Sequence, residues 1–450
     1  MSEPDVSDLL TVAQAIAVID AAAVTPRIEV VPLSQAAGLV LAEDVVADRD
    51  YPPFDKSLMD GYAVRCADVS SAPVELALVG EIPAGQRADR GLAEGETLAI
   101  MTGAPLPPGA DGVVPVEDSE RTTAQRVRLL SATTPGRYIA RRGSEVLRGA
   151  VVLTRGTVLG PAQLAVAASV GAARLPAFAK PRTGVLATGD ELVPADQPPD
   201  HPPGPAQIRN SNSVMLLALL ERLGCAVTDL GTVRDDPAAV RAALLDGIDR
   251  CDVLFVTGGM SMGAYDYVPR TLLDLGVDLR ITKLRIKPGK PFVFGEHRHE
   301  GTESLRRQGR DEAAGASEIT DASSHTPRSV PSCLRASVPS SCYLFGLPGN
   351  PVSGYVCTMR LAARLIARLR GADAEPRWLA GRLAEPLPAN GPREFYQPVV
   401  VAADGSITPL LWKGSADVFT LARATALLPR PENEPALPAG APVRVLEVPS

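Results

Sequence analysis

The chain has 450 residues, of which 45% are hydrophobic and 22% are charged, and its formal net charge is −7. This length exceeds what one hydrophobic core supports, so we expect about three domains. The acidic balance argues against nucleic acid as a partner, and no run of about 18 apolar residues predicts a membrane span. The acidic first residues argue against a signal peptide, so we expect a cytoplasmic protein.

The cysteines and histidines predict neither a disulfide framework nor a zinc site. No Cys-x-x-Cys pair occurs among the six cysteines, and scattered thiols in a long chain are typical of reduced, packed residues. None of the four histidines lies in a catalytic motif, and we interpret His297 and His299 as loop composition, not metal ligands. We therefore expect the chemistry to come from carboxylates, lysines and backbone amides.

The N-terminal segment predicts a helix and two strands. Four apolar residues share one face of the helix expected at 8–21, which Ser7 or Asp8 would cap. Strands are expected at 28–33 and 39–47. The apolar face of the helix would meet a core or a dimer partner.

Residues 51–63 carry more polar groups than a turn requires. Asp55, Lys56, Ser57 and Asp60 all precede Gly61. This segment is either a functional loop or a plain turn between strands.

Short strands broken by glycine and proline predict a small, separate β domain. They are expected at 74–80, 97–101, 112–116 and 126–130. After them, Arg141, Arg142 and Glu145 surround Gly143, which fits either a phosphate clamp or a solvated turn.

Strands and helices alternate after a helix expected at 161–170. The strands are expected at 182–188, 226–230 and 252–256, and the helices at 210–223 and 237–249. This alternation predicts a parallel, doubly wound sheet, in which ligands gather at the carboxyl ends of the strands. Candidate groups follow those ends: Glu191, Asp235 or Asp236, Gly258 with Gly259, and Asp266. For Asp235 and Asp236, capping of the helix that starts at Pro237 is the simpler role.

The stretch 252–291 has the strongest functional pattern. Its apolar strand ends at Val256, and the amides of Gly258 and Gly259 can face an oxyanion because glycine lacks a Cβ. Three cations then alternate with apolar residues and would share one face of a strand: Lys283, Arg285 and Lys287. We expect an anion and a divalent metal here. The alternative is an edge strand that uses lysines against aggregation.

Residues 296–341 are rich in polar residues and poor in large apolar ones, so we expect a disordered insertion. A second glycine-rich loop follows at 343–353 and opens a helix at 352–369, whose first amides suit a phosphate. Residues from 378 onward predict a C-terminal β domain.

Six motifs occur together in the order found in one known family. They are FDKSLMDGYA at 54–63, IMTGAPLPPGAD at 100–111, TGDEL at 188–192, TGGMSMGAYDYV at 257–268, KPGKP at 287–291 and LPGNPVSG at 347–354. With these motifs the chain resembles the molybdopterin molybdenumtransferases of the MoeA type, which include the E domain of gephyrin. The resemblance covers nearly the whole chain.

The resemblance implies that molybdate and adenylated molybdopterin react to give molybdenum cofactor and AMP, with Mg²⁺ as the divalent metal. It implies a homodimer whose site lies between the α/β domain of one subunit and a β domain of the other. The implied fold class is α/β plus β, an elongated chain with a doubly wound parallel-sheet domain and two small β domains. The implied domains are 1–48 with 146–177 for dimerisation, 49–145, 178–370 and 371–450.

The resemblance also implies roles for the matching residues. Catalytic roles go to Asp60, Glu191, Asp235, Asp266, Lys283 and Lys287. Substrate-binding roles go to Thr188, Gly189, Gly258, Gly259, Ser261, Lys290, Pro348, Gly349, Asn350 and Ser353. The metal would be held by Asp266, Glu191 and Asp236, because a hard cation prefers carboxylate and phosphate oxygens. Which of Asp235 and Asp236 reaches the site stays open.

The sequence departs from the family pattern in three places. Glu145 stands where aspartate is more common, Ala264 replaces an acidic residue, and the insertion at 296–341 is long. The loss of a carboxylate at Ala264 would leave more of the task to Asp266.

Two alternatives compete with molybdenum insertion. A molybdopterin adenylyltransferase shares the glycine loops but lacks the Asp60 motif, and a gephyrin-like scaffold would bind a peptide. The family further suggests the adenylyltransferase and molybdoenzyme-maturation proteins as partners. A P-loop is excluded because the chain has no G-x-x-x-x-G-K-[ST] motif.

Overall fold

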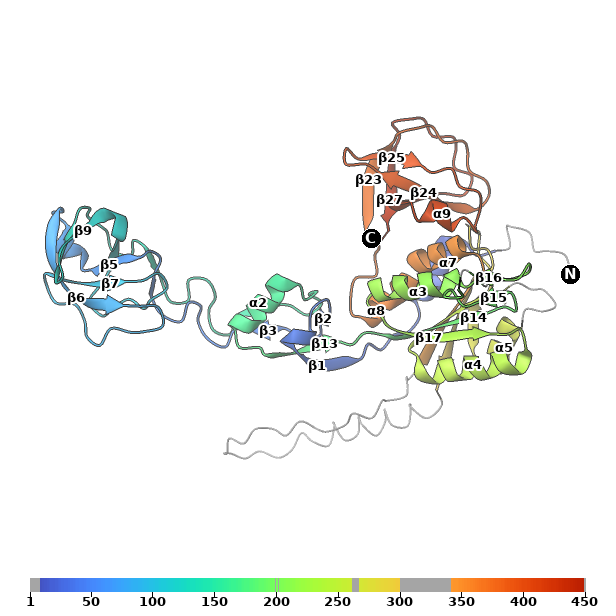
Figure 1. Cartoon of the computed structure of the whole chain (residues 1–450), viewed down its shortest axis with the longest axis horizontal. Helices are drawn as coiled ribbons and strands as arrows, with labels where there is room; N and C mark the ends of the chain where they lie inside the picture. The colour runs from blue at the N-terminus through green and yellow to red at the C-terminus, as the bar shows by residue number, and fades with distance from the viewer. Residues whose placement is uncertain (1–8, 199, 201, 261–266, 300–340, 449–450) are drawn as a thin grey trace, which may run out of the picture. The chain divides into compact units, whose positions relative to one another are not determined.

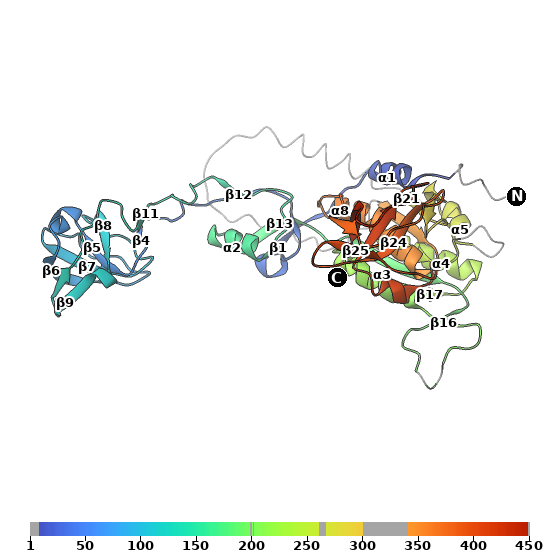
Figure 2. The same cartoon turned by 90° about the horizontal axis from the view of Figure 1, so that it is seen from above.

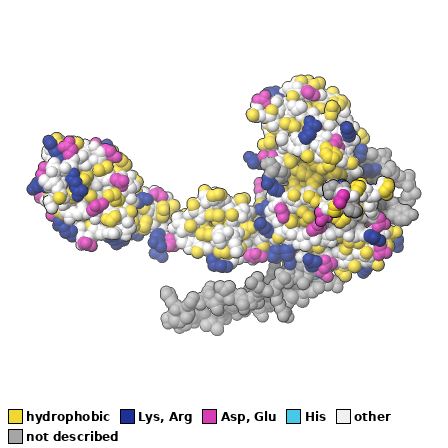
Figure 3. All heavy atoms as spheres, in the orientation of Figure 1, with side chains coloured by type: hydrophobic (Ala, Val, Ile, Leu, Met, Phe, Trp, Pro, Cys, Tyr) yellow, Lys and Arg dark blue, Asp and Glu magenta, His cyan; other side chains and the backbone are white. Residues whose placement is uncertain are grey.

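A computed structural model describes residues 9–198, 200, 202–260, 267–299 and 341–448. The chain forms two compact units: Glu29–Ala177 is the small unit, and Met1–Ile28 with Phe178–Ser450 is the large unit (Figure 1). Among the described residues, no helix is long and apolar enough to cross a membrane. Acidic and basic side chains are interspersed on the face shown in Figure 3.

One part of the small unit is a three-stranded sheet covered by helix α2 (Pro161–Ser169). Its strand order is β1 (Ile28–Pro32), β13 (Arg174–Phe178), β2 (Val40–Leu41). The single strand predicted at 39–47 is wrong, because it divides into β2 and β3 (Val45–Val46), and β3 pairs with β12 (Val151–Leu153) instead. The backbone turns between them, where Asp44 accepts a hydrogen bond from the amide of Arg155 at 2.7 Å.

The other part of the small unit is a six-stranded sheet with the order β8-β5-β7-β6-β10-β9. Four of its strands confirm the predicted ones: β6 (Val74–Ile82), β7 (Glu96–Ile100), β8 (Gly112–Pro115) and β10 (Arg126–Leu129). The sequence analysis missed β5 (Gly61–Val64), which is short, and β9 (Ser119–Thr123), an all-polar strand at the sheet edge. Strand β5 starts directly after Asp60, so the polar segment 51–60 leads into an interior strand of this sheet.

The large unit contains the predicted doubly wound sheet, with the order β17-β14-β18-β22-β21-β19. Strands β17 (Ala226–Val233), β14 (Arg182–Thr188), β18 (Val253–Thr257) and β22 (Ser341–Leu347) are parallel. Strands β21 (Val293–Arg298) and β19 (Asp278–Ile281) continue the sheet in antiparallel pairing. Every residue of β18 is buried, which agrees with the apolar run read as a central strand.

Helices cover both faces of this sheet (Figure 1). Helices α4 (Pro237–Arg250) and α5 (Val268–Asp274) share one core with one side of the strands. Helix α3 (Ser211–Arg222) shares the opposite core with the helix that follows β22. That helix runs as α7 (Pro351–Cys357), a π turn at Thr358–Ala362 and α8 (Ala363–Leu369). The predicted helix at 352–369 is therefore confirmed, with a π turn that the sequence did not reveal.

Helix α1 (Val12–Asp20) belongs to the large unit, not with residues 146–177 as the predicted domain of 1–48 had it. Its buried Val12, Ala15 and Ile19 enter the core that α3 and α8 also line, and it lies beside α8 (Figure 2). The predicted cap at Ser7 or Asp8 is also wrong. Thr11 caps the helix through a capping box with Gln14.

The C-terminal strands close into a small barrel, as the predicted β domain requires. The order β24-β25-β23-β27-β26 is completed by pairing of β26 with β24. The strands are β23 (Trp378–Leu383), β24 (Glu394–Val401), β25 (Ser406–Pro409), β26 (Ala426–Arg430) and β27 (Pro442–Glu447), with the short helix α9 (Val418–Leu421) between β25 and β26.

The predicted insertion at 296–341 begins too early and ends too late. Strand β21 continues to Arg298 and β22 starts at Ser341. The segment between them, residues 300–340, lies outside the described residues.

Candidate functional site

The strand order fixes where the large unit can bind a ligand. The chain crosses from β14 to β17 on one side and then back to β18 on the other side of β14. In a doubly wound sheet the connections then diverge between β14 and β18, and a crevice opens at their carboxyl ends. The loops that start at Thr188 and at Thr257 border that crevice.

These two loops touch, and the contact requires glycine. A Cβ placed on Gly258, where φ is +92°, would lie 2.2 Å from the carbonyl oxygen of Thr188. A Cβ on Gly259, where φ is +61°, would lie 2.9 Å from Thr188 Oγ1. The predicted residues Thr188, Gly258 and Gly259 are thus brought together.

The second glycine-rich loop forms the next wall. Thr257 pairs with Leu347 across β18 and β22, and the amide of Gly258 donates to the Leu347 carbonyl at 3.3 Å. Pro348 is buried, while Gly349 and Asn350 are exposed beyond the strand end. Asn350 begins α7, whose Ser353 is buried.

Asn212 joins these loops, and the sequence analysis missed it. Its Nδ2 donates to Thr257 Oγ1 at 3.0 Å and to the Gly349 carbonyl at 2.7 Å. A carbonyl can accept but not donate, so this contact fixes the amide orientation and turns Oδ1 away from Gly349. Oδ1 of Asn212 and Oγ1 of Thr188 are both buried without a hydrogen-bond partner. Unpaired buried polar atoms at a strand-end crevice indicate a place for a ligand.

The predicted carboxylates Glu191, Asp235 and Asp236 lie around the loop that starts at Thr188. Glu191 folds back over Gly189, since a Cβ there would meet its Oε2 at 2.5 Å. The amide of Asp235 donates to Asp190 Oδ1 at 3.3 Å. Asp236 caps α4 and accepts from the amide of Ala239 at 2.8 Å, so the capping role weighed for this pair belongs to Asp236.

The described residues do not by themselves complete a Mg²⁺ site. No group of three or more His, Cys, Asp or Glu side chains is arranged to hold a metal within the described ranges. Asp266, the central predicted ligand, and Ser261, a predicted substrate contact, both lie outside the described residues.

The basic segment has the predicted alternation. Leu284 and Ile286 are fully buried, while Lys283, Arg285 and Lys287 retain exposure. Arg285 pairs with Glu432 at 3.3 Å, and the Leu284 amide donates to the Lys290 carbonyl at 3.0 Å, which closes the turn.

This turn lies between the barrel and α7. Its short strand β20 (Ile286–Lys287) joins the barrel by pairing with Glu394 and Phe395 of β24. A Cβ on Gly289 would lie 2.5 Å from Cys357 Sγ of α7. The lysine segment therefore packs on the helix that the second glycine loop opens.

In the small unit, Asp60 is held by a single residue. Its Oδ1 accepts from the amide of Thr102 at 2.6 Å and from the Thr102 hydroxyl at 2.7 Å. The backbone hydrogen bond, and then the side-chain one, lower the pKa of Asp60 below its ordinary value, so the carboxylate is ionised at neutral pH.

The arginines near Gly143 stabilise a turn. Arg141 contacts Asp55 at 2.6 Å, and Arg142 contacts Asp50 at 2.7 Å. Of the two readings offered for this segment, the solvated turn fits these ion pairs better than a phosphate clamp.

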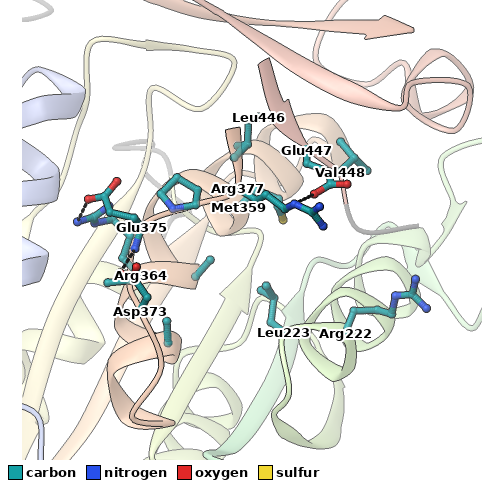
Figure 4. A pocket seen from close by; sticks show the side chains of 14 residues that line it. Arg222, Leu223, Met359, Arg364, Asp373, Glu375, Arg377, Leu446, Glu447 and Val448 are labelled. Atoms are coloured by element: carbon teal, nitrogen blue, oxygen red, sulfur yellow. Dashed lines mark hydrogen bonds and ion pairs between the residues drawn. The ribbon is translucent and has the colours of Figure 1, made fainter. Parts of the chain in front are cut away.

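The described part of the large unit includes two hollows of ligand size. One of about 710 Å³ adjoins the crevice and is lined by Gly189, Asp190, Asn210, Thr232 and neighbouring residues. The other, of about 410 Å³, lies between α3, α8 and the barrel (Figure 4).

The second hollow is separate from the crevice. It meets α3 at Arg222, whereas Asn212 lies near the start of that helix, roughly 15 Å away at 1.5 Å per residue. Its charged residues include Arg364, paired with Glu375 at 3.1 Å, and Arg377, paired with Glu447 at 3.2 Å. The charged groups of this second hollow are thus largely paired with one another, and the hollow is remote from the crevice. The hollow of about 710 Å³ beside the crevice is therefore the one that can extend the ligand site.

Comparisons with known proteins cover the chain from end to end. Family models match the MoeA N-terminal region (domain I and II) at residues 10–171, a probable molybdopterin binding domain at 184–368, and the MoeA C-terminal region (domain IV) at 380–448. A molybdopterin molybdenumtransferase of Nostoc sp. is 32% identical over 435 residues, 94% of this chain and 89% of that protein.

Two further relatives agree. Molybdopterin molybdenumtransferase 2 of Mycobacterium tuberculosis is 34% identical over 437 residues, 93% of this chain and 94% of that protein. The crystal structure of the molybdopterin biosynthesis MoeA protein of Pyrococcus horikoshii matches with a TM-score of 0.74 and 26% identity, covering 98% of this chain and 100% of that one. The chain belongs to the molybdopterin molybdenumtransferase family of molybdenum cofactor biosynthesis.

Proposed function

We propose that this chain inserts molybdenum from molybdate into adenylated molybdopterin and releases AMP and molybdenum cofactor. One observation carries the proposal: the loops that start at Thr188 and Thr257 meet at the switch point of the sheet, where Gly258 contacts Thr188. They do so in a chain that is 32% identical to a named molybdopterin molybdenumtransferase over 94% of its length. The adenylyltransferase and scaffold alternatives are not favoured, because the relatives named above match across all three regions of the chain.

The reaction brings two oxyanions together, and the site offers what they need. Molybdate and the phosphoanhydride are both negative, so backbone amides at Gly258 and Gly259 and the ammonium groups of Lys283, Lys287 and Lys290 would neutralise them. An oxygen nucleophile, supplied or activated by molybdate, attacks the phosphorus of the AMP group. The phosphoanhydride P–O bond breaks, and the molybdopterin phosphate leaves with the electron pair. The two dithiolene sulfurs of molybdopterin then replace oxo groups of molybdate, which leave as water or on AMP, so molybdenum is transferred without a change of oxidation state.

Asn212 and Thr188 would complete the base of the site. Thr188 Oγ1 can donate to a phosphate oxygen, whereas Asn212 Oδ1 can only accept and would face a hydroxyl or amino group of the substrate. Gly189, Pro348, Gly349, Asn350, Ser353 and Ser261 are proposed as further substrate contacts.

Carboxylates are proposed as the acidic part of the machinery. Asp60 keeps Oδ2 available while Thr102 holds Oδ1, so it can contact a substrate or a metal ligand shell. Glu191, Asp235 and Asp266 are proposed to act with it, and Asp266, Glu191 and Asp236 to bind Mg²⁺. Loss of AMP release in EDTA, restored by Mg²⁺, is the test of the metal.

A homodimer is proposed as the functional form. The Asp60 motif lies in the small unit and the glycine loops lie in the large unit, so each could complete its site with the other unit of a second copy. Mass measurement by light scattering tests this: a mass of twice 47.1 kDa supports the dimer, and a monomer that turns over normally contradicts it.

The function is tested by adding molybdate and adenylated molybdopterin to the purified protein and measuring AMP. We expect molybdate-dependent release in the natural protein and none in Asp60→Ala or Asp266→Ala. Asp89→Ala is the matched control, since Asp89 is an exposed aspartate of the small unit outside the proposed site. Full release by Asp60→Ala and Asp266→Ala would contradict the assignment.

A further inference from the structure

Two aromatic side chains of the barrel stack on each other at the edge that faces the lysine turn. The rings of Phe395 and Trp412 have centroids 5.6 Å apart and are inclined by 28°. Phe395 lies on β24, and Trp412 lies in the segment between β25 and α9. Both rings are partly exposed, so the pair is not a closed piece of the barrel core. We propose that Trp412 stacks a planar nitrogen heterocycle of the substrate beside the glycine loops.

This inference rests on the proposed function. Adenylated molybdopterin carries two planar nitrogen-containing ring systems, the pyrimidine ring of the pterin and the adenine, and each has a π-face that an indole can cover. Aromatic stacking on bases is strong and tolerant of base identity.

The pair is joined to the proposed oxyanion site on both sides. Lys287 Nζ lies 4.9 Å from the Phe395 ring centroid, and Lys287 pairs with Phe395 across β20 and β24. On the other side, the Val352 amide of α7 donates to the Ser415 carbonyl at 3.1 Å, three residues beyond Trp412. A ring on Trp412 would thus lie near both the lysine turn and the loop that opens α7.

The stacking order leaves Trp412 as the ring that can receive a ligand. Phe395 is covered by Lys287 through a cation–π contact and by Trp412. The other tryptophan, Trp378, is flanked by the guanidinium groups of Arg360 at 5.6 Å and Arg444 at 5.4 Å. Trp412 stacks on Phe395, packs in part against the large-unit core that α3 and α8 line, and stays partly exposed; the adjacent residue Leu411 is 98% exposed.

Binding measured by calorimetry tests the proposal on the full chain, with AMP, molybdopterin and adenylated molybdopterin as separate probes. We expect Trp412→Ala and Trp412→Leu to weaken binding of adenylated molybdopterin roughly 5- to 100-fold, the range for loss of one base-stacking aromatic. Trp412→Phe should retain most of the affinity, because it keeps a π-face. Leu411→Ala is the matched control and should bind as the natural protein does.

The separate probes identify the stacked ring. Weaker binding of AMP in Trp412→Ala assigns the adenine to Trp412, and weaker binding of molybdopterin assigns the pterin. Unchanged binding of all three probes in the Trp412→Ala and Trp412→Leu variants would overturn the proposal. The proposal would also be overturned if Trp412→Phe lost as much affinity as Trp412→Ala while its thermal unfolding stayed unchanged, because the loss of binding would then not depend on the presence of an aromatic ring.

The outcome is separable from failure of the proposed function. A natural protein that binds AMP or molybdopterin through Trp412 but releases no AMP from adenylated molybdopterin contradicts the function and supports the stacking. A natural protein that releases AMP, with Trp412→Ala binding unchanged, contradicts the stacking alone.

Discussion

Replacement of Gly258 by alanine is the sharpest test of the crevice. The new Cβ would lie 2.2 Å from the Thr188 carbonyl oxygen, and contacts below 3.0 Å must be relieved by movement. Both groups belong to backbone that continues from neighbouring parallel strands, so no flexible side chain can move aside. The loops after β14 and β18 must therefore separate by about 1 Å.

Two separate costs follow from this change. An L-residue at the positive φ of +92° loses roughly 1–2 kcal/mol. Overpacking against fixed backbone adds about 1–3 kcal/mol. A displacement of about 1 Å in a catalytic loop also lowers turnover by about 100-fold, so Gly258→Ala should lose both stability and AMP release.

Gly276→Ala separates the two effects. Gly276 has a φ of +80° in the same unit, but a Cβ there would have no neighbour within 4 Å. We expect this control to lose roughly 1–2 kcal/mol in thermal unfolding and to release AMP at the natural rate. Equal AMP release by Gly258→Ala and Gly276→Ala, or an equal loss of stability in both variants, would refute the close approach of the loops as the reason for glycine at position 258.

Three other predictions follow from single contacts. Asn212→Asp puts an oxygen against the Gly349 carbonyl 2.7 Å away and should lower kcat/KM for AMP release about 10- to 100-fold, whereas unchanged kinetics would exclude the clamp. Thr102→Val removes one donor to Asp60 and should raise the pKa of that carboxyl, which NMR titration would measure. Because the folded pKa of Asp60 lies below the ordinary 3.8, the hydrogen bonds stabilise the protein above pH 4, and this stabilisation is lost as the pH falls through the folded pKa. An unchanged pKa of Asp60 in Thr102→Val would contradict this. Asp252→Ala removes the partner of Arg182, whose Nη2 lies 2.8 Å from Oδ1, and should cost about 3 kcal/mol in thermal unfolding, while a change below about 0.5 kcal/mol would show that the pair is dispensable.

The fold of the large unit could be predicted because its signals are local. The apolar run before Thr257 is long enough for a buried strand, and glycines at its end mark the loop. Alternation with helical periods then implies a parallel sheet, and its topology directs the ligand to the strand ends. None of these steps requires knowledge of a distant contact.

Residues that depend on tertiary contacts could not be predicted in the same way. Asn212 follows Asn210 at the start of α3, where an asparagine is fully explained by helix capping, and Asn210 does accept from the Ser213 amide. The contacts of Asn212 with Thr257 and Gly349 join residues 45 and 137 positions away. The packing partner of α1 could not be predicted for a similar reason, because an amphipathic pattern indicates which face of a helix is buried but not which surface buries it. The Thr11 capping box, by contrast, depends only on the local pattern T-x-x-Q at residues 11–14 and is therefore predictable from the sequence.

The π turn at Thr358–Ala362 links the barrel to the helix behind the second glycine loop. Arg360 within this turn donates through Nε to Tyr396 Oη at 2.7 Å, and Tyr396 is fully buried in β24. The Tyr396 hydroxyl donates in turn to Glu394. Burial raises the pKa of Tyr396, so the phenol keeps the proton that this bond requires.

That link has a consequence for the site. Strand β24 carries Phe395 between these two residues and pairs with β20, which carries Lys287. The same helix begins at the loop containing Gly349, and about two turns later its Arg360 donates the hydrogen bond to Tyr396. The barrel therefore holds Lys287 and its aromatic pair in register with the glycine loops through partly buried hydrogen bonds. A π turn is suited to this role, because the extra residue re-aims Arg360 toward the barrel without ending the helix.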